Sequence, residues 1–160
     1  MVRLIDKNKG HQGSESELGG LGLDYLISMI KQHEGLRLKP YKCTADKLTI
    51  GYGRNLEDRG ITQKEADVLL INDIYLCYQE LECFSWFPDL DNVRQMAIVD
   101  LCFNMGLPTL LKFRKALAAM AEGLYAKAAE EFLDSKWAGQ VGEGRSGKIA
   151  AMIRTGELQK

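Results

Sequence analysis

The chain has 160 residues, of which 46% are hydrophobic, and its 21 basic and 22 acidic residues leave a net charge of −1. A chain of this length can form one domain that buries about two thirds of its unfolded surface without disulfide or metal staples. A charge so near zero argues against nucleic acid as the main partner, because nucleic-acid-binding proteins are usually strongly basic. The charge is uneven, with a net +2 over residues 1–50, −6 over 51–100 and +3 over 101–160.

The sequence contains no recognisable membrane or secretion signal. No stretch approaches the roughly 20 apolar residues of a membrane span, and residues 1–22 lack the apolar centre of a signal peptide. We therefore expect synthesis in the cytoplasm and no stable membrane anchor. The four cysteines lack the spacing of metal ligands, so reduced thiols are expected, and neither a metal nor another cofactor is predicted.

The first elements in chain order are an arm, a helix and a hairpin. Residues 1–22 are polar and rich in glycine, which predicts a flexible N-terminal arm before a domain over residues 23–160. From Leu23 apolar residues recur at helical spacing as far as Gly35, so Glu34 is expected in the last turn of a helix. Residues 35–61 contain aromatic and β-branched residues between glycines and predict a small β-hairpin lobe.

The rest of the chain predicts helices. The capping box Thr62-Gln63-Lys64-Glu65 starts a long connecting helix over about residues 62–82. Asp91 can cap a further long helix that runs to Gly106. Apolar residues lie on nearly all faces of this helix, as in a helix buried in a bundle. Shorter helices are expected near 113–122, 125–134 and 145–154, with a loop over 137–144. The predicted class is α+β and mostly helical, with a helical lobe over 83–160 and a groove between the lobes for an extended ligand.

The segment from His33 to Asn55 carries the residues of greatest chemical interest. It places the carboxylate of Glu34 at a helix end, facing a hairpin that offers the thiol of Cys43 and the hydroxyl of Thr49. A lone glutamate at a helix end is usually a solvated surface residue, and a lone threonine is usually an ordinary strand residue. Spacing alone therefore assigns no function to this segment.

The same segment resembles the catalytic signature of the phage-type lysozymes, glycoside hydrolase family 24. In that signature a Glu is followed after eight residues by Asp or Cys and after five more by Thr, and Glu34, Cys43 and Thr49 have those spacings. The resemblance covers about residues 23–158. Its further motifs are E-G-x-R-L-x-x-Y, T-I-G-x-G, Phe103-Asn104-Met105-Gly106, Ser135-Lys136-Trp137, Arg145 and Arg154-Thr155-Gly156.

The resemblance implies a two-lobed lysozyme-like fold and a muramidase, as in an endolysin that lyses its host. Such an enzyme hydrolyses the β-1,4 bond between N-acetylmuramic acid and N-acetylglucosamine in peptidoglycan. The leaving oxygen needs a proton as the bond breaks, and a carboxylic acid holds that proton at neutral pH only in partly buried surroundings. Glu34 is the expected acid, tucked against the hairpin, with Arg145 as a charge partner or a substrate ligand.

Cys43 stands at the second catalytic position, where other family members have Asp. An inverting glycosidase needs a base across the sugar ring, and a thiol of ordinary pKa, about 8.5, is mostly protonated at neutral pH. Three roles stay open. The first is a thiolate that acts as base or nucleophile, which we favour because the family pattern tolerates Cys at this position. The second is a bystander, in an enzyme whose Glu34 and Thr49 position the water. The third is lost or redirected chemistry. Thr49 is expected to orient the water or the base.

A second group of residues is predicted to bind substrate. Gly51 and Gly53 would let the hairpin backbone approach the sugars, although ordinary hairpin glycines are an equal alternative. Arg54 departs from the family, many of whose members have His there. Trp137 is expected to be a packing anchor. The predicted substrate-binding residues are Gly51, Gly53, Arg54, Asn55, Phe103, Asn104 and Arg145, of which Phe103 and Asn104 fit core packing equally well.

Two other functions are compatible with these residues. A lytic transglycosylase needs the acid but no base, and a non-catalytic peptidoglycan-binding protein would keep the cleft without turnover. The expected partner is the peptidoglycan glycan strand. The chain is expected to be a monomer that is made in the host cytoplasm, depends on a holin-type protein for release, and acts on peptidoglycan in the periplasm.

Overall fold

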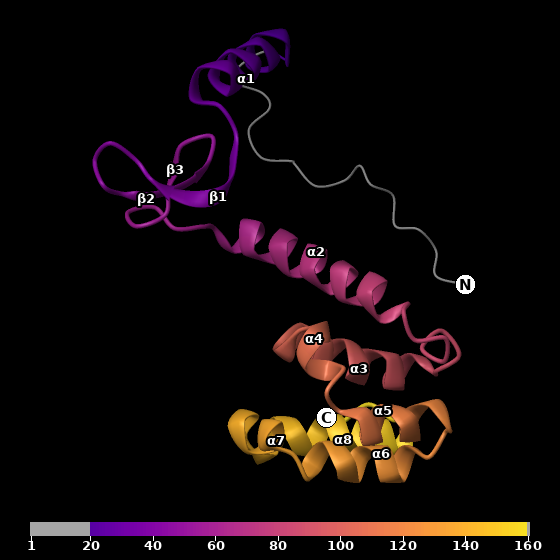
Figure 1. Ribbon diagram of the computed structural model, residues 1–160. Coiled ribbons are helices and arrows are strands. Elements are labelled where there is room, and N and C mark those ends of the chain that lie inside the picture. Colours follow the sequence, from indigo (N-terminus) through magenta and orange to yellow (C-terminus); the bar gives the residue numbers. More distant parts are fainter. Residues whose placement is uncertain (1–19, 160) are drawn as a thin grey trace. The chain divides into compact units, whose positions relative to one another are not determined.

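The computed structural model describes residues 20–159, so the predicted arm lies outside the described residues except for positions 20–22. The chain divides into two compact units, of which one extends to Thr62 and the other begins at Gln63. The elements of both are labelled in Figure 1. None of the helices in the described range is both long and apolar enough to cross a membrane.

The first unit consists of one helix followed by a small sheet (Figure 1). Helix α1 (Gly20–Glu34) begins three residues before its predicted start. It ends where predicted, because Gly35 takes a φ of +66° and donates its N–H to Lys31 O at 3.1 Å. Strands β1 (Arg37–Lys42), β2 (Leu48–Gly51) and β3 (Arg54–Asn55) form an antiparallel sheet in that order. The predicted hairpin is confirmed and gains a short third strand.

Among the described residues of the second unit the regular elements are all helices, and together with the sheet they confirm the mostly helical α+β class. Its helices are α2 (Gln63–Leu81), α3 (Asn92–Met105), α4 (Leu107–Leu110), α5 (Arg114–Ala121), α6 (Tyr125–Leu133), α7 (Lys136–Val141) and α8 (Glu143–Thr155). Helix α4 was not predicted. The predicted loop over 137–144 is wrong, because Ser135 caps α7 by accepting the Ala138 N–H at 3.4 Å.

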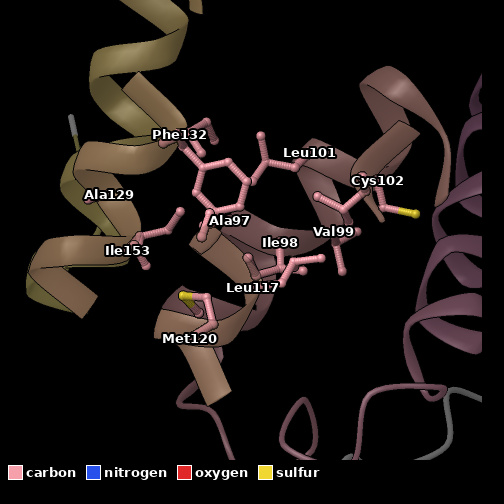
Figure 2. Packing of buried hydrophobic residues seen from close by; sticks show 14 of the residues in the cluster. Ala97, Ile98, Val99, Leu101, Cys102, Leu117, Met120, Ala129, Phe132 and Ile153 are labelled. Atoms are coloured by element: carbon pink, nitrogen blue, oxygen red, sulfur yellow. The ribbon is translucent and has the colours of Figure 1, made fainter. Parts of the chain in front are cut away.

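The core of the second unit is built around α3 and Phe132. Figure 2 shows the Phe132 ring directed toward Ala97 and Leu101 of α3, while the Cys102 sulfur points away from it. Each large apolar side chain buried in this way contributes about 1.5–3 kcal/mol. Cys77 of α2 is also buried. Five residues of α3 are buried, in agreement with its predicted place inside a bundle: Ala97, Ile98, Val99, Leu101 and Cys102.

Arg94 joins the start of α3 to the end of α8. Its Nε donates to Ile153 O at 2.8 Å and its Nη2 to Arg154 O at 3.1 Å, so it satisfies carbonyls that have no partner within α8. The guanidinium also pairs with Asp91 and lies 3.9 Å from the Tyr125 ring centroid. This one side chain therefore connects the N-terminus of α3, the C-terminus of α8 and the start of α6.

Candidate active site

The Glu34 carboxylate lies at the end of α1, against the turn between β2 and β3. A Cβ placed on Gly53 would be 3.2 Å from Glu34 Oε2, so the missing side chain of Gly53 leaves room for the carboxylate. The hairpin does not bury Glu34, whose side chain remains exposed. The first unit thus positions the carboxylate from one side, through the backbone at Gly53.

The two glycines predicted to approach the sugars have different structural reasons. Gly53 has a φ of +83° and also faces Glu34, whereas a Cβ on Gly51 would meet nothing within 4 Å. Gly51 is required by its φ of +68°, which L side chains rarely adopt. Glycine is therefore needed at position 51 for the backbone conformation alone. At position 53 it is needed both for the backbone conformation and for the space that the Glu34 carboxylate occupies.

Cys43 begins a five-residue loop, residues 43–47, between β1 and β2. Its N–H donates to Lys47 O at 3.0 Å, and its carbonyl accepts from the Asp46 N–H at 2.9 Å. Asp46 closes the turn with a φ of +56°, and it is the one residue other than glycine with a positive φ in the described chain. The Cys43 side chain is half-buried and its thiol is free.

The surroundings of Cys43 in this loop favour the charged form of its thiol. The N–H of Lys47 above all, then the N–H of Ala45, and also the Thr49 hydroxyl hold the pKa of the Cys43 thiol below its ordinary value, while partial burial opposes them. Donors that face a sulfur favour its charged form. Cys43 is therefore more often a thiolate at neutral pH than an ordinary cysteine, which is the condition for a base or nucleophile.

Thr49 lies on β2 opposite Tyr41, and its side chain is 3% exposed. Its Oγ1 donates to Lys47 O at 3.0 Å and is also a hydrogen-bond partner of the Cys43 sulfur. One hydroxyl proton serves one acceptor at a time. We infer that Thr49 donates to the sulfur when Cys43 is a thiolate and to Lys47 O when Cys43 is protonated. The Thr49 hydroxyl thus contacts the end of the loop that begins at Cys43.

Arg54 and Asn55 form β3 and use their side chains in the connection that follows it. Arg54 Nη1 donates to Gly60 O at 3.2 Å. Asn55 Nδ2 donates to Asp58 Oδ2 at 2.9 Å, and Asn55 Oδ1 accepts the Asp58 N–H at 3.0 Å. Both ends of the Asn55 amide therefore stabilise the turn over residues 55–58.

The remaining predicted site residues belong to the second unit. At the end of α3, Phe103 is 43% exposed, and Asn104 Oδ1 accepts a hydrogen bond from Trp137 Nε1 at 2.9 Å. Trp137 is buried, which confirms it as a packing anchor. Arg145 on α8 donates from Nε and Nη2 to Asp100 Oδ1 at 3.1 and 2.9 Å. Within this unit Arg145 thus has a carboxylate partner on α3.

Sequence reasoning missed two residues of these surroundings. Asp100 is the one acidic residue in the apolar run of α3, and that isolation is a signal that could have revealed it. Glu57, whose Oε1 accepts the Leu48 N–H at 2.9 Å, follows no recognisable pattern. Residues 20–159 contain no group of three or more His, Cys, Asp and Glu side chains placed to hold a metal ion.

Comparison with known proteins relates most of the chain to one family. A family model described as phage lysozyme matches residues 31–153, which include Glu34, Cys43 and Thr49 as well as Arg145. The probable T4-type lysozyme 1 of Dictyostelium discoideum is 29% identical over 160 residues, covering 81% of this chain and 94% of the relative. The endolysin of Acyrthosiphon pisum secondary endosymbiont phage 1 is 33% identical over 138 residues, covering 84% and 91%. The chain belongs to the phage lysozyme family, and it is a glycosidase of the muramidase type.

Proposed function

We propose that Glu34 and Cys43 carry the hydrolysis of the β-1,4 bond between N-acetylmuramic acid and N-acetylglucosamine in peptidoglycan. Glu34 donates a proton to the leaving sugar oxygen as the bond breaks. The observation that carries the proposal is that both residues lie in the segment matched by the phage lysozyme family model. The Lys47 and Ala45 N–H groups and the Thr49 hydroxyl lower the pKa of the Cys43 thiol, which favours the charge that an aspartate carries at neutral pH.

The Cys43 thiolate can complete the reaction in two ways. As a base it takes a proton from water while the water oxygen attacks the anomeric carbon, which inverts that centre. As a nucleophile it forms a carbon–sulfur bond to the sugar, which water must then break. In the first route the sulfur ends as a thiol, and Thr49 can return its hydrogen bond to Lys47 O, 3.0 Å away. Thr49 thus stabilises the charged state of Cys43.

For substrate binding, the helical unit offers the exposed pair Phe103 and Asn104. The Trp137 hydrogen bond holds the Asn104 amide in one orientation and leaves its nitrogen as a donor. The Phe103 ring is 43% exposed and can lie against a sugar face. Arg145, held by Asp100, supplies a positive charge for an anionic wall polymer. Substitution of Phe103 by Ala should raise KM more than it lowers kcat.

The proposal is tested by a turbidity assay on Gram-negative cells whose outer membrane has been permeabilised. We expect Glu34→Gln to be nearly inactive, Cys43→Ser to be reduced and Cys43→Asp to remain active. Circular dichroism of each variant separates a chemical effect from misfolding. Full activity in Glu34→Gln would refute its role as the acid, and wild-type activity in Cys43→Ser would refute the thiolate while leaving the muramidase unaffected.

The products distinguish hydrolysis from the alternatives. Mass spectrometry of released muropeptides should find free reducing ends, because water is the final acceptor in the proposed reaction. Ends in the 1,6-anhydro form would instead identify a lytic transglycosylase, whose sugar attacks with its own 6-hydroxyl. A protein that binds purified walls but releases no muropeptides would be a binding protein.

We further propose that the enzyme lyses a bacterial host after reaching the periplasm through a membrane opening made by a separate holin-type protein. The support is the similarity to a phage endolysin. Expression of the chain alone in the cytoplasm should leave a culture intact, and chloroform or a co-expressed holin should then cause rapid lysis. Lysis without either treatment would contradict the dependence on a second protein.

A further inference from the structure

The loop that carries Cys43 is held by Glu57, a residue without a part in the proposed chemistry. Glu57 Oε1 accepts the Leu48 N–H at 2.9 Å and lies 3.3 Å from Lys42 Nζ. Its Oε2 lies 3.8 Å from Lys47 Nζ. Lys42 precedes Cys43, and Lys47 is the last residue of the loop. One carboxylate therefore contacts both ends of the five-residue loop.

The hydrogen bond from the Leu48 N–H to the Glu57 carboxylate continues the hydrogen bonding of the sheet beyond β3. The Leu48 carbonyl accepts the Leu56 N–H at 2.8 Å, just beyond β3. Because the N–H and the carbonyl of a strand residue point to the same side, the Leu48 N–H also faces this connection. There the Glu57 carboxylate takes the place of a backbone carbonyl. This fixes the first residue of β2, immediately after Lys47.

Lys42 and Lys47 transmit this restraint into the loop. Lys42 Nζ donates to Asp46 O at 2.9 Å, at the residue with positive φ. Lys47 Nζ pairs with Asp58 Oδ1 at 3.1 Å, and Asp58 above all raises the pKa of Lys47. The Leu48 N–H first, and then Lys42, lower the pKa of Glu57. The raised pKa of Lys47 and the lowered pKa of Glu57 therefore favour the charged forms of both groups.

We propose that Glu57 is a positioning residue for Cys43, which holds the loop over residues 43–47 in the conformation that sets the surroundings of the thiol. The functional part of this inference rests on the role proposed for Cys43 above. The lysine side chains that pair with Glu57 are 56% and 41% exposed, and Glu57 itself is 39% exposed. Exposed ion pairs add little to global stability. Loss of Glu57 should therefore loosen the loop and leave the protein folded.

The reactivity of the Cys43 thiol measures the loop directly and does not depend on catalysis. Cys83 is exposed, so the full-length chain is used with Cys83→Ser as the background. Cys77 and Cys102 are buried, and burial raises the pKa of Cys77 and raises that of Cys102 to about 12, which leaves Cys43 as the reactive thiol of the described residues. The rate of alkylation by iodoacetamide is measured against pH in this background.

Three variants separate the contributions of Glu57. Glu57→Ala removes both the Leu48 acceptor and the charge, and Glu57→Gln keeps an acceptor for Leu48. Asp24→Asn is the matched control, because it removes one exposed negative charge from α1 in the same unit. We expect Glu57→Ala to raise the pH midpoint of alkylation by about half a unit or more, Glu57→Gln to raise it less, and Asp24→Asn to leave it unchanged.

The second measurement is the lytic activity of the same variants in the turbidity assay. We expect Glu57→Ala to lose activity several-fold near neutral pH and to regain part of it at higher pH, with an unchanged melting temperature. A wild-type alkylation midpoint in Glu57→Ala would overturn the positioning role. A raised midpoint with wild-type activity would support the positioning role and refute the catalytic thiolate, so the two proposals fail by different results.

Discussion

The Glu34 carboxylate lies in the space that a side chain on Gly53 would fill. A Cβ at position 53 would be 3.2 Å from Glu34 Oε2, a distance at which the carboxylate must move by a few tenths of an ångström. Gly53 is in the turn between β2 and β3, and Glu34 is the last residue of α1. The expected acid can therefore occupy its position only because residue 53 has no side chain.

Substitution of Gly53 by Ala should displace this carboxylate and reduce kcat about 10-fold or more, since small displacements of a catalytic group are costly. Gly51→Ala is the matched control. Its φ of +68° imposes a similar backbone strain, but its Cβ meets nothing within 4 Å. Both variants should lose similar stability in urea titrations, and Gly53→Ala alone should show the larger fall in kcat. Equal losses of kcat would attribute the effect to strain in the turn.

Thr49→Val should weaken the thiolate of Cys43. Valine keeps the shape of this buried residue but removes the hydroxyl that serves both Lys47 O and the Cys43 sulfur. We expect the alkylation midpoint of Cys43 to rise and the muramidase activity at neutral pH to fall, while Thr49→Ser retains most of both. If Val and Ser behave alike, the hydroxyl has no part in setting the charge of Cys43.

The acid side of the pH–activity profile should depend on Cys43. A thiolate whose pKa is lowered is present above that pKa, and activity that needs it is lost as the pH falls through the same value. In Cys43→Asp the ionising group has an ordinary pKa of about 3.9, well below that of a thiol. The acid limb of the profile should therefore move to lower pH in this variant, and an unmoved limb would assign it to another group.

Gly156→Ala should destabilise the helical unit more than its backbone angle alone predicts. The φ of +71° costs an L residue about 1–2 kcal/mol, and a Cβ would also stand 2.5 Å from Arg94 Nη1. Arg94 is fixed by Ile153 O and Arg154 O, so it cannot move away freely. Gly123→Ala is the control, with the same φ of +71° and nothing within 4 Å. Urea denaturation should find Gly156→Ala the less stable of the two.

Asp91→Ala should cost about 1 kcal/mol of unfolding free energy at neutral pH, a usual value for a helix cap. Asp91 Oδ1 accepts the N–H groups of Val93 and Arg94, each at 3.0 Å. Burial opposes ionisation, but these bonds and the Arg94 guanidinium hold the pKa of Asp91 below its ordinary value. Its stabilisation is therefore present above about pH 4 and is lost as the pH falls through the lowered pKa. The difference between wild type and variant should vanish at low pH.

Periodicity and capping residues predicted most of the fold. The ends of α1 and α3 agree with Gly35 and Gly106, because both glycines take a positive φ that does not continue a right-handed helix and that other residues rarely adopt. The loop predicted over 137–144 is wrong because contacts within the folded chain favour a helix there. The segment contains three glycines, but the Ser135 cap and the burial of Trp137 maintain a helix as far as Val141.

The candidate site was predictable where its residues follow a motif and unpredictable where they act through contacts distant in sequence. Glu34, Cys43 and Thr49, together with the motifs around them, predicted the family through resemblance. No local pattern could place Asp100 beside Arg145, 45 residues away, or the Glu57 carboxylate on the Leu48 N–H. These contacts depend on how helices pack and how a strand ends, which are properties of the folded chain.

The hydrogen bond between Trp137 and Asn104 gives the enzyme an internal optical probe. The chain has two tryptophans, and Trp86 is stacked on Phe84 with ring centroids 5.0 Å apart. In a Trp86→Phe variant, fluorescence would come from Trp137 alone. Its emission wavelength would then follow the polarity around the Asn104 amide, so a glycan fragment that contacts this end of α3 could be titrated without any label.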